Sequence, residues 1–110
     1  MKLQDLSNID WLEPWSPCSL ATIERQAQKE IPLGHALWGQ TLIAIGRRQD
    51  CDDVLFFLPD HSRPLAVVHL TWAGKQEPDS QFPLSRFFSS LNEFLDECMK
   101  KDHEDFHWKP

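Results

Sequence analysis

The stretch that decides the fold runs from residue 41 to residue 72. It reads TLIAIGRR (41–48), VLFFL (54–58) and LAVVHLTW (65–72), with short polar segments between the three pieces. Each piece is rich in the apolar and β-branched residues that favour strands. Strands joined by connections this short pair as antiparallel neighbours. The sequence therefore predicts a three-stranded antiparallel meander.

A helix is predicted before this meander. Ser16-Pro17 resembles a helix start, with serine as the N-cap and proline in the first helical position. The residues after it carry an apolar stripe, made of Leu20, Ile23, Ala27 and Ile31. Glu30 is among the charged residues expected to face water, and Pro32 ends the helix.

A long amphipathic helix is predicted after the meander, over residues 84–101. Its apolar positions recur at helical spacing, and they are Leu84, Phe87, Phe88, Leu91, Phe94, Leu95, Cys98 and Met99. Residues 102–110 are expected to form a frayed tail. The expected fold class is thus α+β, in a single domain over residues 1–110.

Both faces of the predicted sheet are apolar. Residues 54–58 and 65–68 show no alternation between apolar and polar side chains, so neither face is expected to lie in water. The two helices can cover one face. Either the N-terminal segment around residues 11–15 or a second subunit must cover the other, which leaves a homodimer as one of two alternatives.

Composition excludes several classes of partner. The 110 residues carry a formal net charge of −6, with the excess of acid concentrated in the last third. Such a charge repels phosphate backbones, so we expect no nucleic-acid partner. No apolar run approaches the roughly 20 residues of a membrane span. The three cysteines are far apart and follow no secretion signal, which favours reduced thiols in the cytoplasm.

Two histidines are candidates for a binding or catalytic site. His69 lies within VVHLTW, where desolvation would favour the neutral ring, able to act as a base or a ligand. A core histidine with one hydrogen-bond partner is the more common alternative. His35 and Trp38 lie in GHALWG, a loop shaped by its glycines. The alternative there is a surface histidine, with Trp38 packing as a lid.

A charged turn supplies the remaining candidates. Arg47 and Arg48 precede Asp52 and Asp53, and together they could bind a phosphate, a carboxylate or a metal. Alternatively, arginine–aspartate pairs neutralise one another within the hairpin. Strand alternation places Arg47 and Arg48 on opposite faces, so at most one joins a given pocket. The phosphate-loop, dinucleotide and C-x-x-C motifs are missing, and no cofactor is expected.

The middle of the chain resembles a group of small bacterial proteins to which no activity is assigned. The residues that carry the resemblance are GHxLxG (34–39), AIxRRxDxDDVLF (44–56) and AVVHLTW (66–72), within a similar region of about residues 20–90. The resemblance implies a compact α+β cytosolic protein. It supplies no activity, cofactor or substrate.

Two functions are compatible with these patterns. The first is a non-enzymatic binding protein, which engages a protein partner through its acidic surface and its aromatic side chains. The second is a small enzyme or metal-binding protein built on His35, His69 and Asp52 or Asp53, with an arginine as anchor. Convergence of those side chains in an open cleft would favour the second function.

Overall fold

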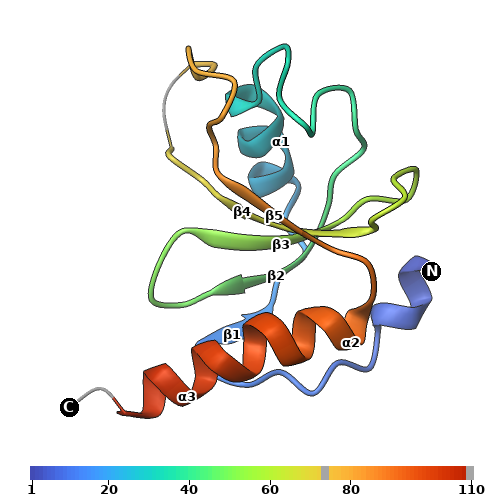
Figure 1. Ribbon diagram of the computed structural model, residues 1–110, viewed down its shortest axis with the longest axis vertical. Coiled ribbons are helices and arrows are strands. Elements are labelled where there is room, and N and C mark those ends of the chain that lie inside the picture. Colours follow the sequence, from blue (N-terminus) through green and yellow to red (C-terminus); the bar gives the residue numbers. More distant parts are fainter. Residues whose placement is uncertain (73–74, 109–110) are drawn as a thin grey trace.

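A five-stranded antiparallel sheet forms the centre of the molecule in a computed structural model, which describes residues 1–72 and 75–108 (Figure 1). The strands are β1 (Trp15–Pro17), β2 (Ile43–Arg48), β3 (Asp53–Phe57), β4 (Leu65–His69) and β5 (Ser85–Phe88). They lie in the order β1-β2-β3-β4-β5. The α+β class is confirmed. The three predicted strands are the central ones, and β1 and β5 extend the meander at its two edges.

Helices cover both faces of the sheet. Figure 1 shows α1 (Ala21–Glu30) on one side and a helix from the C-terminal part of the chain on the other. We call the latter the C-terminal helix; it consists of α2 (Leu91–Phe94), the π-helical turn η2 (Leu95–Met99) and α3 (Lys100–Trp108). A short 3-10 helix, η1 (Leu3–Leu6), lies near the N-terminus.

The predicted start of the first helix is wrong. Ser16 and Pro17 belong to β1, where they pair with Arg47 and Gly46 of β2. The main chain of Cys18 extends this pairing by donating to the carbonyl of Ile45 at 2.8 Å. The pairing satisfies the main chain of this segment and places Trp15 in the core, so α1 begins only at Ala21.

The predicted long helix over residues 84–101 is also wrong at both ends. Ser85–Phe88 is strand β5, in which Phe87 and Phe88 point to opposite faces of the sheet. The helix begins after Ser90, whose side chain accepts a hydrogen bond from the Glu93 amide at 3.1 Å. It then continues past Lys101 to Trp108, so residues 102–108 of the expected tail are helical.

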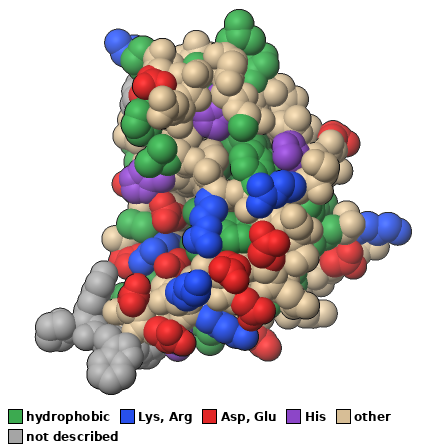
Figure 2. Space-filling model, viewed as in Figure 1, with side chains coloured by type: hydrophobic (Ala, Val, Ile, Leu, Met, Phe, Trp, Pro, Cys, Tyr) green, Lys and Arg blue, Asp and Glu red, His purple; other side chains and the backbone are tan. Residues whose placement is uncertain are grey.

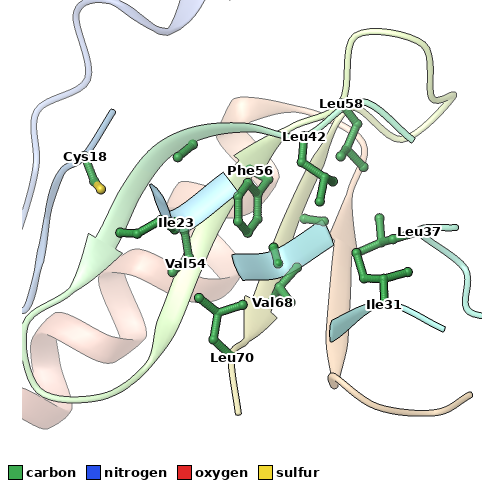
Figure 3. Close-up of a cluster of buried hydrophobic side chains, with 13 residues drawn as sticks. Cys18, Ile23, Ile31, Leu37, Leu42, Val54, Phe56, Leu58, Val68 and Leu70 are labelled. Atoms are coloured by element: carbon green, nitrogen blue, oxygen red, sulfur yellow. The ribbon is translucent and has the colours of Figure 1, made fainter. Parts of the chain in front are cut away.

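Two separate apolar cores lie on the two faces of the sheet. The core under α1 is shown in Figure 3, where Phe56 of β3 lies among Ile23, Val54 and Val68. The other core holds Trp15, Leu55, Phe88 and Phe94, with the ring of Trp15 edge-on to Phe94 at 5.3 Å between centroids. Because the chain's own C-terminal helix covers this second face, the face gives no reason for a second subunit.

The N-terminal segment closes against the sheet at a glycine. A Cβ atom placed on Gly46 would overlap the ring of Trp11, so the close approach of this ring requires glycine in β2. Within residues 1–72 and 75–108, we find no helix with the length and apolar character needed to cross a membrane.

Candidate functional site

A small pocket between the sheet and the C-terminal helix gathers three of the predicted site residues, Arg48, Asp53 and His69. It has a volume of about 230 Å³. We call it the polar pocket, and it is lined by Arg48, Asp53, Val67, His69, Leu84, Ser85, Arg86, Cys98 and Asp102. Figure 2 shows charged side chains of both signs over the C-terminal helix, whereas uncharged side chains dominate the end that carries α1.

Asp53 and His69 form a pair at the mouth of this pocket. They are register partners on β3 and β4, and the Oδ1 atom of Asp53 lies 2.7 Å from Nδ1 of His69. The expected desolvation of His69 is wrong, because its side chain is 51 % exposed at the last position of β4. The described residues place no hydrogen-bond partner on its Nε2 atom, so this nitrogen can exchange a proton with a bound molecule.

Arg48 enters the pocket from β2 but is already paired. Its Nε and Nη2 atoms donate to both carboxylate oxygens of Asp50 at 2.8 Å, and Nη1 lies 3.4 Å from Asp102. The hydrogen bonds that Arg48 donates to Asp50 raise the pKa of Arg48, and the charge of Asp102 adds to that increase. Arg48 is therefore neutralised by aspartates, as in the arginine–aspartate pairing considered from the sequence. It is not a free arginine that could anchor an anionic ligand.

Asp102 connects the pocket to the core. Its Oδ2 atom accepts hydrogen bonds from the indole Nε1 of Trp15 at 2.8 Å and from Sγ of Cys98 at 3.5 Å. Burial of Cys98, followed by the negative charge of Asp102, raises the pKa of this thiol to about 12. The thiol is protonated at neutral pH, so Cys98 does not serve as a thiolate nucleophile for the Asp53–His69 pair.

Arg86 is the pocket residue that the sequence did not reveal. It lies on β5, where its Nη2 atom donates to the carbonyl of Glu97 at 3.1 Å and its guanidinium stands 5.0 Å from the centroid of the Phe88 ring. No acidic side chain of the described part of the chain forms an ion pair with it. The wrong helix over residues 84–101 concealed it, as the expected tail concealed Asp102.

His35 lies apart from this pocket, buried beside the loop that precedes β5. Its Nδ1 atom accepts a hydrogen bond from the Leu37 amide at 2.9 Å, and its Nε2 atom donates to the carbonyl of Pro83 at 2.7 Å. Both ring nitrogens are therefore used in holding the main chain. His35, and not His69, is thus the core histidine held by hydrogen bonds. The two histidines do not converge.

The other predicted residues are also dispersed. Asp52 accepts a hydrogen bond from the indole Nε1 of Trp72 at 3.1 Å, outside the polar pocket. Trp38 is half exposed and lines a separate pocket of about 330 Å³ with Leu37 and Gln40. Arg47 does not line the polar pocket that Arg48 enters. The structure thus brings together Arg48, Asp53 and His69, but not Arg47, Asp52, His35 or Trp38.

A buried carboxylate was also missed. Glu30, expected to face water, is fully buried at the end of α1. Its oxygens accept hydrogen bonds from Gln26 Nε2 at 2.7 Å and from the amides of Thr71 and Trp72 at 2.7 and 3.0 Å. Trp72 has a φ angle of 57°, in the left-handed region that such residues rarely adopt. The signal was present, because Glu30 follows Ile23 and Ala27 at the i+7 and i+3 positions of the apolar stripe.

No metal centre is found in residues 1–72 and 75–108, where no group of three or more His, Cys, Asp and Glu side chains is arranged to hold an ion. No protein-family model matches the chain, and searches of curated proteins and of solved structures gave no match either. The resemblance to small bacterial proteins stays a prediction.

Proposed function

We propose that this protein is a small cytosolic binding protein, without catalytic activity, that engages a basic protein partner. The contact surface is an acidic end of the molecule, made by Glu13 of the N-terminal segment and by Glu104 and Asp105 of α3. One contact carries the proposal: Nδ1 of His103 lies 2.7 Å from the carbonyl of Glu13 and so holds the two segments together.

The charge of this acidic end is not balanced by an ion pair within residues 1–72 and 75–108. Lys100 and Lys101, the basic residues nearest to it on the helix, are paired with Asp96 at 2.9 Å and Glu97 at 3.4 Å. Glu104 and Asp105 are exposed and have no ion pair within the described residues. Acidic side chains in the last turn of a helix oppose its dipole. Their position therefore costs some stability, which a basic partner would recover on binding.

Affinity capture from the cell that makes the protein tests this proposal. We expect a basic protein to be retained by the wild type, released as salt rises, and lost with the Glu104→Lys and Asp105→Lys double variant. Asp60→Lys is the control, because Asp60 is exposed in the β3–β4 connection. Equal retention by the double variant, or the absence of any salt-sensitive partner, would contradict the proposal.

A second function is supported by one observation: the open Nε2 atom of His69, in a pair with Asp53, lines the same pocket as Arg86, which has no ion pair within the described residues. Such an arrangement suits acid–base chemistry on a small anionic molecule, without a metal. Thermal-shift screening of small carboxylates and phosphates tests it. A compound that raises the Tm of the wild type but not of His69→Ala would support it, and a panel without effect would leave the binding protein as the better proposal.

A further inference from the structure

The outer edge of β5 leaves main-chain groups without a partner. The His69 amide donates to the carbonyl of Leu84 at 2.9 Å, so residues of β5 bond to β4 at every second position from there, at Arg86 and Phe88. The main-chain groups of Ser85 and Phe87 therefore point away from β4. The described residues provide no hydrogen-bond partner for the Ser85 amide, the Ser85 carbonyl or the Phe87 amide.

Side chains close this edge at both ends. The Nη2 atom of Arg63 donates to the carbonyl of Phe87 at 2.7 Å, and the His35 ring donates to the carbonyl of Pro83 at 2.7 Å. The unpaired groups between them form a short, defined segment of edge. A strand edge is a template for another extended chain, and capped ends fix how far such a chain can pair.

Two arginines lie beside this edge, and one of them, Arg86, has no ion pair within the described residues. Arg86 is exposed on the side of the C-terminal helix, next to the half-exposed His69. Arg63 is half exposed, and its Nη2 atom lies 3.8 Å from the nearest carboxylate oxygen of Glu93. The ring of His61 is stacked on the ring of Phe87. A chain that pairs with β5 is therefore favoured when it carries negative charge.

We propose that the edge of β5 binds an extended acidic peptide segment as a sixth, antiparallel strand. One of its residues would exchange main-chain hydrogen bonds with Ser85, and a second would accept a hydrogen bond from the Phe87 amide, with both side chains on the α1 side of the sheet. The residue between them would lie opposite Arg86, on the side of the polar pocket. An apolar–acidic–apolar sequence satisfies both sides, with the carboxylate placed on Arg86.

A second copy of this chain fits the edge less well. Antiparallel pairing of β5 with itself about Arg86 sets two arginines directly opposite each other, which is destabilising. The proposed strand site is separate from the acidic end, so its test does not depend on whether a basic partner exists.

Short capped peptides test the proposal with the full chain, by NMR titration. We expect Thr-Val-Glu-Val-Thr to bind and to shift the Ser85 and Phe87 amide resonances. Thr-Val-Lys-Val-Thr, and the glutamate peptide with both valines N-methylated, should bind about tenfold more weakly, because they lose the charge pair or the ladder hydrogen bonds. Equal binding of the N-methylated peptide, or no binding of the glutamate peptide at millimolar concentration, would overturn the proposal.

Matched variants locate the site. Arg86→Glu should reverse the preference between the glutamate and lysine peptides, whereas Arg25→Glu, on the exposed face of α1, should leave it unchanged. Ser85→Pro removes one edge amide and should weaken binding about tenfold relative to Ser85→Ala. If Ser85→Pro does not fold, the N-methylated peptide still decides. A dimer in sedimentation that Arg86→Glu alters would assign the edge to a second copy and would overturn the proposal.

Discussion

The two sides of the sheet treat their polar groups in opposite ways. On the α1 side, Glu30 and His35 are buried, and each is held by several hydrogen bonds to the main chain. On the side of the C-terminal helix, His69 and Arg86 are exposed, and each keeps a polar group that has no partner in the described part of the chain. On the first side, the polar groups form hydrogen bonds that hold loops in place. The second side keeps them available for another molecule.

This difference separates stability from recognition. A buried group with several partners is costly to remove, because its former partners remain in the interior without hydrogen bonds. An exposed pair in water contributes little to folding, whatever its distance. Substitutions on the two sides should therefore have very different effects on the free energy of unfolding, and the following predictions test that contrast.

Glu30→Ala should have the largest effect. The substitution leaves the Thr71 and Trp72 amides without an acceptor and removes the restraint on the left-handed backbone at Trp72, so we expect a loss of about 3 kcal/mol or more. Chemical denaturation measures it. Lys29→Ala, at the exposed neighbouring position of α1, is the control and should change stability by less than about 0.5 kcal/mol. Similar values for the two variants would contradict the structural role of Glu30.

His35→Ala should come next, with a loss of about 2 kcal/mol, because the Leu37 amide and the Pro83 carbonyl lose their buried partner. Denaturation is again the measurement, and amide hydrogen exchange should show increased opening of the 34–40 loop. A loss below about 0.5 kcal/mol would mean that the loop is held by packing and does not need these hydrogen bonds.

Cys98 predicts a change of stability with alkaline pH. Its pKa is about 12 in the folded chain and near 9.0 in the unfolded chain, so the unfolded state loses its proton first. The stabilisation is complete below about pH 9 and is lost as pH rises towards 12. The free energy of unfolding should fall across this range, and it should fall less in Cys98→Ala. Identical pH profiles would show that the buried thiol does not contribute.

His69→Ala should have the smallest effect, below about 0.5 kcal/mol, because the Asp53–His69 pair is open to solvent. Thermal and chemical unfolding measure it beside His35→Ala. A destabilisation as large as that of His35→Ala would remove the contrast between the two sides of the sheet.

Much of the fold could be predicted from the sequence. The central strands follow from local apolar runs with short connections. This pattern can be recognised without knowing the tertiary contacts. Ser16-Pro17 and residues 84–88 were assigned wrongly, because helical spacing and edge pairing compete there, and pairing across the sheet is not visible in local sequence. The positions of Arg63 and Arg86 beside the outer edge of β5 depend on that pairing and could not be predicted.

The candidate site was predictable only in part. Asp53 and His69 become neighbours through the β3–β4 register, which the positions of the two strands imply. Asp102 and Cys98 reach the same pocket through a helix whose direction the sequence did not give. The opposite environments of His35 and His69 depend on how far each element is covered, which periodicity does not report.

The placement of the tryptophans also makes the molecule its own optical probe. The chain has five Trp and no Tyr, so absorbance and emission near 280–350 nm report indole rings alone. Trp15 of β1 is buried against the C-terminal helix, whereas Trp38 and Trp72 are about half exposed in loops after α1 and β4. Acrylamide should quench the exposed rings while the sealed one continues to emit at shorter wavelength. Detachment of the C-terminal helix would then be visible as a red shift that precedes or accompanies global unfolding, without any added label.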